Sequence, residues 1–160
     1  MLLRTADTAD IDTLMTWFPD AASIRHWSGP DFDYPFDRDS FHRDCKWRDI
    51  DSYCLESHGT LQGFGQVYPR DNRVNLARLV IHPQARGSGL GQQLISALIR
   101  EGQQTLGLDE AGLFVYRSNA AAWCCYRAAG FDVAPMPEDV DLGPEARYLV
   151  RAIRPEQAAS

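Results

Sequence analysis

The sequence predicts an α/β fold of the α+β type, in which a central mixed sheet, mostly antiparallel, is flanked by helices. Two turn-forming segments, His58-Gly59 and 70–72, separate three strand-like runs, which favours consecutive antiparallel strands. A long amphipathic segment then leads to another apolar run at 111–116, as in a strand-helix-strand crossover. An alanine-rich segment and two further strand-like runs complete the pattern.

The first third of the chain predicts one strand and two helices. Residues 2–5 form the strand, and Asp7 has the residue type of a helix N-cap, with Asp10 in the first turn. Apolar residues then recur at the spacing of one buried helical face, at Ile11, Leu14, Met15 and Phe18. The pattern breaks up between Pro19 and Trp47, where a second helix is expected from Asp37 or Asp39 to Asp49.

The rest of the chain alternates between strands and helices. The expected strands are 53–56, 61–68, 74–81, 111–116, 131–134 and 148–153. The expected helices are 90–106, which ends near Gly107, and 119–129, which ends at Gly130. We expect one domain over residues 1–154 and a loose C-terminal tail over 155–160.

Composition excludes several classes of protein. The net charge of −6 argues against a nucleic-acid binder, because such proteins present a basic face to phosphate. No segment approaches the roughly 18 apolar residues of a membrane span, and Met1-Leu2-Leu3-Arg4 does not begin a signal peptide. A cytoplasmic protein without membrane or nucleic-acid partners is therefore expected.

Four cysteines, at 45, 54, 124 and 125, lack a Cys-x-x-Cys pair or a neighbouring histidine at metal-binding spacing. We expect buried free thiols, with neither a metal nor a redox role.

The segment Arg86-Gly87-Ser88-Gly89-Leu90-Gly91 joins a strand to a helix and predicts an anion site. The unpaired N–H groups at the start of a helix attract anions, and glycines let a ligand approach the backbone. A nucleotide triphosphate loop is excluded because the only lysine, Lys46, follows no glycine. A dinucleotide loop is excluded because its third glycine position falls on Gln92 or Leu94.

The spacing Arg86-x-x-Gly89-x-Gly91 resembles the pyrophosphate loop of the GCN5-related N-acetyltransferase (GNAT) family, Gln/Arg-x-x-Gly-x-Gly/Ala. A second segment, Asn119-x-x-Ala122-x-x-x-Tyr126-x-x-x-Gly130-Phe131, resembles the signature of the family's fourth helix. The resemblance implies the GNAT acetyltransferase fold, with acetyl-CoA as co-substrate, no metal, and an amine acceptor.

The resemblance also implies roles for individual residues. Tyr126 is expected to be the catalytic acid that protonates the leaving thiolate, without a covalent cysteine intermediate. The expected cofactor-binding residues are Leu79, Val80, Ile81, Arg86, Gly87, Ser88, Gly89, Leu90, Gly91 and Asn119. Structural alternatives remain open for these residues. Residues 79–81 also suit a plain buried strand, Asn119 also suits a helix cap, and Tyr126 also suits a position in the core.

A general base is harder to identify. Phe114 occupies one position at which some family members carry a glutamate, and the strand expected at 74–81 contains no carboxylate. His82, Glu56, Asp71 or a chain of water molecules remain as weak alternatives. An acceptor amine with a low pKa needs no dedicated base.

The region between Trp17 and Trp47 holds eight of the chain's 17 aromatic residues. In the family this region lines the acceptor side of the cleft, so the aromatics together with Asp31, Asp33 and Asp37 suit an apolar cation or amine. The alternative is that the aromatics pack the helices onto the sheet while the aspartates stay solvated.

These observations predict an N-acetyltransferase that transfers acetyl directly, in a ternary complex, to a small-molecule or peptide amine. A catalytically silent acyl-CoA-binding or sensor domain of the same fold is the alternative, and a nucleotide-binding α/β protein is a weaker third. A homodimer is compatible with the sequence, which does not determine the oligomeric state.

Overall fold

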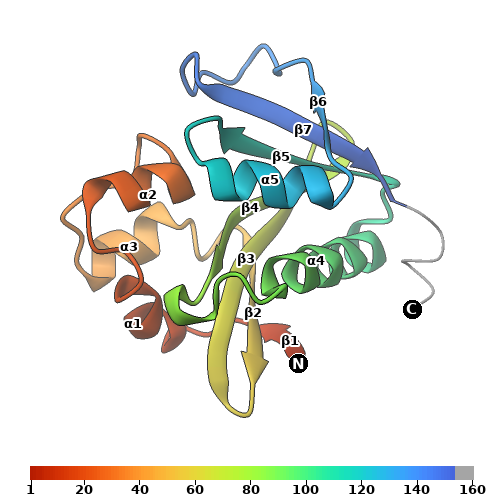
Figure 1. Ribbon diagram of the computed structural model, residues 1–160. Helices are drawn as coiled ribbons and strands as arrows, with labels where there is room; N and C mark the ends of the chain where they lie inside the picture. Colours follow the sequence, from red (N-terminus) through yellow and green to blue (C-terminus); the bar gives the residue numbers. More distant parts are fainter. Residues whose placement is uncertain (154–160) are drawn as a thin grey trace.

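The computed structural model describes residues 1–153, which form a seven-stranded sheet with the order β1-β2-β3-β4-β5-β7-β6 (Figure 1). Only β4 and β5 run parallel, so the mixed, mostly antiparallel sheet is confirmed. The strands are β1 (Leu2–Thr5), β2 (Asp51–Ser57), β3 (Thr60–Arg70), β4 (Arg73–Ile81), β5 (Glu110–Tyr116), β6 (Asp132–Ala134) and β7 (Ala146–Ala152). The tail predicted for 155–160 lies outside the described residues.

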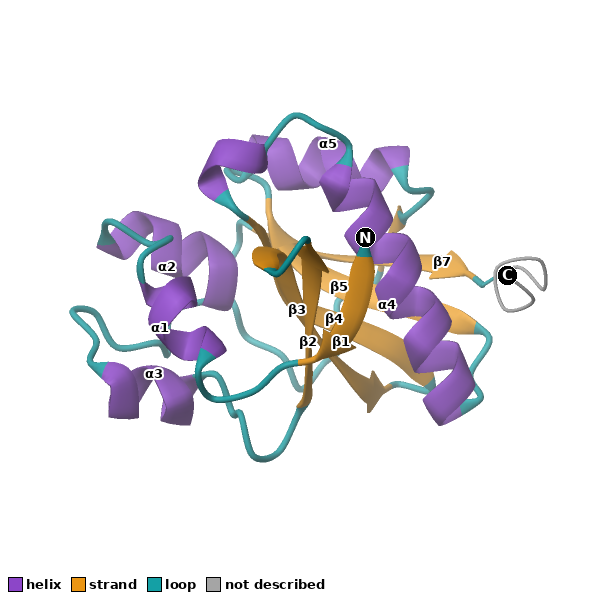
Figure 2. Ribbon diagram, turned by 90° about the horizontal axis from the view of Figure 1, so that it is seen from below, coloured by secondary structure: helices purple, strands orange, loops and turns teal. Residues whose placement is uncertain are grey.

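The helices cover the two faces of the sheet. Figure 2 shows α1 (Asp10–Met15), α2 (Ala21–Ser28) and α3 (Arg38–Asp44) gathered on one side, and α4 (Leu90–Leu106) on the other. The last helix, α5 (Ala120–Ala128), lies beside β5 and packs into the same core as α4. Within residues 1–153, no helix is both long enough and apolar enough to cross a membrane.

Each face of the sheet has its own hydrophobic core. Side chains alternate along β2, so Tyr53 and Leu55 join the core under α4 while Cys54 joins the core under α1 to α3. The buried face of α4 repeats at helical spacing through Leu94 and Leu98, as its sequence predicts. The core under α1 to α3 contains most of the aromatic cluster, including Phe18, Phe32, Phe41 and Phe64.

The N-terminal helices differ most from the sequence prediction. The first begins at Asp10 because residues 7–9 form a turn in which Asp7 Oδ1 accepts from Ala9 N–H at 2.8 Å. The eight-residue α2 was not predicted, although Asp20 and Ser23 form a capping box at its start. Asp37 caps α3, but this helix ends at Asp44 rather than Asp49.

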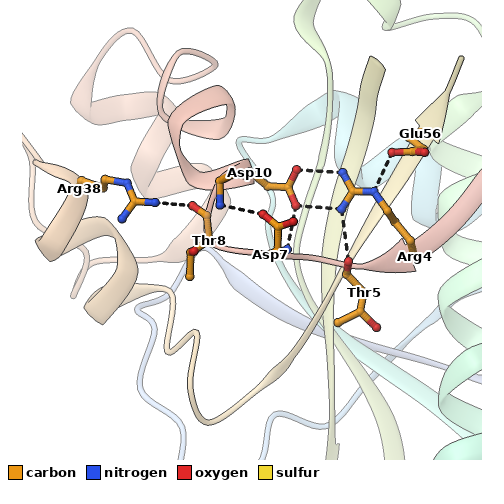
Figure 3. Close-up of polar contacts among 8 residues, drawn as sticks. Arg4, Thr5, Asp7, Thr8, Asp10, Arg38 and Glu56 are labelled. Atoms are coloured by element: carbon orange, nitrogen blue, oxygen red, sulfur yellow. Dashed lines mark hydrogen bonds and ion pairs between the residues drawn. The ribbon is translucent and has the colours of Figure 1, made fainter. Parts of the chain in front are cut away.

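A polar network fixes this helical layer to the edge of the sheet (Figure 3). Arg4 on β1 donates two hydrogen bonds of 2.9 Å to the carboxylate of Asp10 and one of 2.6 Å to Glu56 on β2. Burial alone would raise the pKa of Asp10, but hydrogen bonds from Arg4 and from Asp7 N–H lower the pKa below its ordinary value. Arg38 of α3 donates to Thr8 O at 2.6 Å, which connects the third helix to the same network.

Candidate functional site

A cleft of about 790 Å³ lies at the place where β4 and β5 separate. The two strands pair only from Val74↔Ala111 to Leu76↔Leu113. Beyond Leu76, the end of β4 and Phe114 of β5 line the cleft instead of pairing with each other. The β4 backbone therefore offers N–H and C=O groups to an extended ligand on that side.

A β-bulge shapes the same end of β4. Phe64 pairs with Val80 and Gln66 with Ala77, so two residues, Arg78 and Leu79, lie opposite Gly65. Arg78 has a φ of 50°, a left-handed conformation that is uncommon for a residue with a side chain. Gly65 makes the bulge possible, because a Cβ atom there would lie 2.9 Å from Leu79 Cδ2 and 2.5 Å from Leu98 Cδ1.

The loop from β4 to α4 forms one end of the cleft. A short 3-10 turn, Pro83–Ala85, follows His82, and Arg86 Nε then donates to Ile81 O at 3.2 Å. Gly89 is the N-cap of α4 with a φ of 83°, a conformation that suits glycine, and no side chain caps the helix. The first N–H groups of this 17-residue helix therefore face the cleft end without an intrahelical acceptor.

The other side of this end of the cleft is α5. Asn119 occupies the N-cap position of α5 but makes no side-chain cap hydrogen bond, so helix capping does not explain its amide. Its side chain has no hydrogen-bond partner within residues 1–153, and the residue lines the cleft. Asn119 can therefore bind a ligand through its amide.

Tyr126 lines the cleft from the next turns of α5. Its hydroxyl has no hydrogen-bond partner in the described part of the chain, yet it is not among the polar atoms sealed from solvent. Burial raises the pKa of Tyr126 well above its ordinary value, with a smaller contribution from Cys125. The phenol is therefore held in its protonated form, as a proton donor must be.

The cleft brings together most of the residues that the sequence singled out. Those that line it are Leu79, Val80, Ile81, Arg86, Gly87, Gly89, Leu90, Gly91, Asn119 and Tyr126. Ser88 does not line it, because its hydroxyl turns back and donates to Ala85 O at 2.5 Å. The roles of these residues in binding and catalysis stay predictions.

The aromatic region divides into two parts. Trp17, Phe18 and Trp27 line the cleft, whereas Phe32 and Phe41 pack inside the core under the N-terminal helices. The three aspartates do not line the cleft; Asp33 forms a 2.7 Å ion pair with Arg43, Asp37 caps α3, and Asp31 is exposed on the loop after α2. The expected aspartate-lined cation site is therefore wrong.

None of the three proposed bases lines the cleft. His82 packs against Trp17 and its Nδ1 accepts from Gln84 N–H, Glu56 pairs with Arg4, and Asp71 lies at the turn between β3 and β4. His26 of α2 does line the cleft, with its Nε2 3.1 Å from Ser118 Oγ. Sequence reasoning missed His26 because it missed α2.

The cleft has an unusual charge for an acidic protein. Its lining residues include two arginines, Arg78 and Arg86, and no aspartate or glutamate among the described residues. No group of three His, Cys, Asp or Glu side chains within residues 1–153 is placed to hold a metal ion. Cys45 and Cys54 are buried free thiols as predicted, but Cys124 is exposed and lines the cleft with Cys125.

The cleft thus combines an open strand edge, an uncapped helix N-terminus and a tyrosine hydroxyl, groups that are chemically suited to a long ligand with amides and phosphates. The family model of the acetyltransferase (GNAT) family matches residues 21–131, and the chain belongs to this family. The GNAT resemblance drawn from the two motifs is thereby confirmed.

Similar proteins include a mycothiol acetyltransferase of Salinispora arenicola (strain CNS-205), 34% identical over 96 residues. That match covers 56% of this chain but only 31% of the relative, so the chain spans about a third of that protein. The spermidine N-acetyltransferase of Vibrio cholerae, solved in complex with CoA and spermine, has a TM-score of 0.72 at 14% identity, covering 99% of this chain and 98% of that one.

Two further solved structures share the fold. The aminoglycoside acetyltransferase AAC(6')-Ib in complex with coenzyme A has a TM-score of 0.72 at 19% identity, over 94% of this chain and 93% of that one. The ribosomal-protein-alanine N-acetyltransferase of Brucella melitensis has a TM-score of 0.71 at 20% identity, over 96% and 100%. At these identities the likeness establishes the fold.

Proposed function

We propose that the protein is an acetyl-CoA-dependent N-acetyltransferase that transfers acetyl directly to the amine of a small molecule or peptide, within a ternary complex. The observation that carries this proposal is the convergence, in one cleft, of the open edge of β4, the N-terminus of α4 and the hydroxyl of Tyr126. Solved relatives of the same fold were obtained with CoA or acetyl-CoA, which supports the donor.

We call the part of the cleft lined by the end of β4, the start of α4 and α5 its donor half, and its groups suit the chemistry of CoA. The uncapped first turn of α4 and the side chain of Arg86 suit the diphosphate. The unpaired edge of β4 at 79–81 suits the amides of pantetheine, and Asn119 lies across the cleft from it on α5. A thioester positioned this way brings its sulfur toward Tyr126.

The transfer step needs one acid and one base. The amine nitrogen attacks the thioester carbonyl, a C–N bond forms, and the C–S bond breaks. Tyr126 donates its hydroxyl proton to the leaving thiolate, and the resulting phenolate regains a proton from solvent. Because burial raises the pKa of Tyr126, the hydroxyl stays protonated in the resting enzyme.

His26 is assigned to receive the proton that the amine must lose. An alkylamine with a pKa of about 10.4 is almost entirely protonated at pH 7, a deficit of roughly 4.6 kcal/mol. Histidine is the side chain that most often acts as a general base in enzymes. His26 is the only histidine among the described residues that line the cleft. Its contact with Ser118 Oγ fixes one ring nitrogen, and the other has no hydrogen-bond partner among residues 1–153.

The proposal is tested by measuring CoA release from acetyl-CoA across a panel of amines, dipeptides and aminoglycosides, with CoA affinity measured in parallel by calorimetry. Arg86→Gln should weaken CoA binding about 10-fold, the cost of one charged phosphate contact. Arg48→Gln, an exposed change outside the cleft, is the matched control.

Three results are distinguishable. Amine-dependent CoA release supports the proposal. Tight CoA binding with no transfer to any amine identifies a silent acyl-CoA-binding domain instead. Tighter binding of ATP or NAD than of CoA contradicts both.

A further inference from the structure

The acceptor half of the cleft is the part lined by the N-terminal helical region, including Trp17, Phe18 and Trp27. The β4 bulge turns Arg78 toward the helices of this region. In a regular strand Arg78 would share a face with Val74 and Leu76, which belong to the core under α4. The extra residue in the bulge reverses this alternation. Arg78 instead shares a face with Val80, which packs in the core under α1 to α3.

Two polar side chains hold the guanidinium of Arg78 in this position. Its Nε donates to Ser28 Oγ at 2.7 Å, at the end of α2, and its Nη1 donates to Gln66 Oε1 at 2.9 Å. Gln66 is completely buried and is itself fixed by hydrogen bonds to Cys45 O and Ser52 Oγ. Arg78 is therefore positioned by a network that reaches across β3 to β2.

None of the partners of Arg78 is a carboxylate. Arg78 forms no ion pair within residues 1–153, and its Nη2 has no hydrogen-bond partner there. Nη2 is not among the polar atoms sealed from solvent, and the residue lines the cleft. Burial lowers the pKa of Arg78, and the more distant carboxylate of Asp44 opposes this shift only in part. A partly buried guanidinium without a paired carboxylate is costly.

The left-handed backbone of Arg78 adds to this cost. Such a conformation is unfavourable for a non-glycine residue, and strain of this kind concentrates at functional sites. The fold thus retains a strained bulge and a positive charge without a paired carboxylate at the acceptor side of its cleft. A negatively charged ligand group would compensate that charge.

Building on the proposed N-acetyltransferase function, we propose that the acceptor carries a carboxylate near its amine and that Arg78 binds this carboxylate. The acceptor is then of the amino-acid class, with an apolar portion that contacts Trp17, Phe18 and Trp27. Arg86 is occupied by the diphosphate of the donor, so Arg78 is the cation left for the acceptor. A polyamine would instead bring positive charge to Arg78 in a cleft that no carboxylate of residues 1–153 lines.

The test uses amines matched in shape and differing in charge: L-phenylalanine, L-phenylalaninamide and phenethylamine, the same series built on L-leucine, and spermidine. The first readout is kcat/KM with acetyl-CoA. The second is the Kd of each amine for the CoA-bound protein, followed by the change in intrinsic tryptophan fluorescence, to which Trp17 and Trp27 contribute from the cleft. The second readout reports binding even where no transfer occurs.

We expect the carboxylates to bind at least 10-fold more tightly than the matched amides and amines, as a charged hydrogen bond to Arg predicts. Arg78→Gln should abolish this preference while leaving the affinity for CoA unchanged. Arg78→Lys, which keeps the charge, should retain part of it. Arg25→Gln is the control, because Arg25 is a charged residue of α2 that does not line the cleft. This variant should retain the full preference for carboxylates.

Equal or weaker binding of the carboxylates overturns the assignment of Arg78, as does a preference that survives in Arg78→Gln. Acetylation of phenethylamine or spermidine with no preference for carboxylates leaves the N-acetyltransferase proposal standing and contradicts only the role of Arg78. Absence of transfer to every amine, together with CoA binding, contradicts the enzymatic proposal, and the fluorescence readout then decides the role of Arg78.

Discussion

A Cβ atom at Gly91 would lie 2.9 Å from Sγ of Cys125, so the side chain of Cys125 on α5 packs directly against the glycine of α4. Gln92, the next residue of α4, donates to the backbone oxygen of Cys125 at 2.8 Å and strengthens the same contact. The two helices that border the donor half of the cleft are therefore joined at the residue that immediately precedes Tyr126.

Gly91→Ala should disturb this contact. The added methyl group forces α4 and α5 apart, which we expect to destabilise the fold by about 1–3 kcal/mol and to weaken CoA binding. Thermal unfolding and calorimetry with CoA measure the two effects. Cys125→Ala should rescue Gly91→Ala, because it removes the sulfur that the methyl group meets; a double variant no better than the single one would contradict this reason.

Tyr126→Phe should lower kcat by about 10²-fold or more and leave the Kd for CoA unchanged, since it removes only the proton donor. Because burial raises the pKa of Tyr126, the phenol should cause no fall in wild-type kcat below about pH 10, the ordinary value for tyrosine. Tyr116→Phe is the matched control, since it removes a buried hydroxyl that has no partner in the described structure. Unchanged turnover in Tyr126→Phe would exclude the role of proton donor.

His26→Gln should lower kcat/KM at pH 7 by about 10²-fold if His26 receives the amine proton. The deficit should shrink as the pH approaches the pKa of the acceptor amine, because the free amine then needs no base. A pH profile from 6 to 10 measures this. His42→Gln is the control, since His42 stacks on Trp47 away from the cleft; a deficit that is constant across the pH range would indicate a positioning role for His26.

Asp10→Asn should lower stability at pH 7 by about 1–3 kcal/mol, because it breaks the paired hydrogen bonds from Arg4. The folded-state pKa of Asp10 lies below its ordinary value of 3.8, so its contribution is complete above that pH and is lost as the pH falls through the folded pKa. Denaturant unfolding between pH 2 and 7 should show a larger loss of stability at low pH in the wild type than in Asp10→Asn, which keeps only the contributions of other carboxylates such as Asp44 and Asp139.

The control for that change is Asp12→Asn. The Asp12 side chain is 63% exposed in its pair with Arg38, against 12% for Asp10, so we expect a loss below about 0.5 kcal/mol. Equal losses at the two positions would argue against the network as the source of stability.

The donor half of the cleft could be predicted from the sequence because local rules determine it. The glycine spacing around Gly89 specifies a turn and a helix start, and Asn119 and Tyr126 are two helical turns apart on one helix. Neither inference depends on long-range packing. The hairpin turns and the long apolar face of α4 were predictable for the same reason.

The acceptor half could not be predicted in this way. The eight residues of α2 carry only two large apolar side chains, Ile24 and Trp27, three positions apart, so the apolar pattern is too short to mark the helix that carries His26. Its clearest local signal is the capping box of Asp20 and Ser23. The direction of Arg78 depends on one extra residue in β4, which is accommodated by the absence of a side chain at Gly65 on the neighbouring strand. A one-residue change of register has no signature in composition or spacing.

The separation of β4 from β5 also has a consequence for the order in which substrates meet. Leu94 and Ile95 line the cleft from the core under α4, while Trp17 and Phe18 line it from the core under α1 to α3. The opening therefore passes through the sheet from one face to the other. For the proposed transfer, the donor and the acceptor would therefore approach from opposite faces of the sheet. Neither substrate would then block the entrance of the other, and each product would leave on the side from which its substrate came.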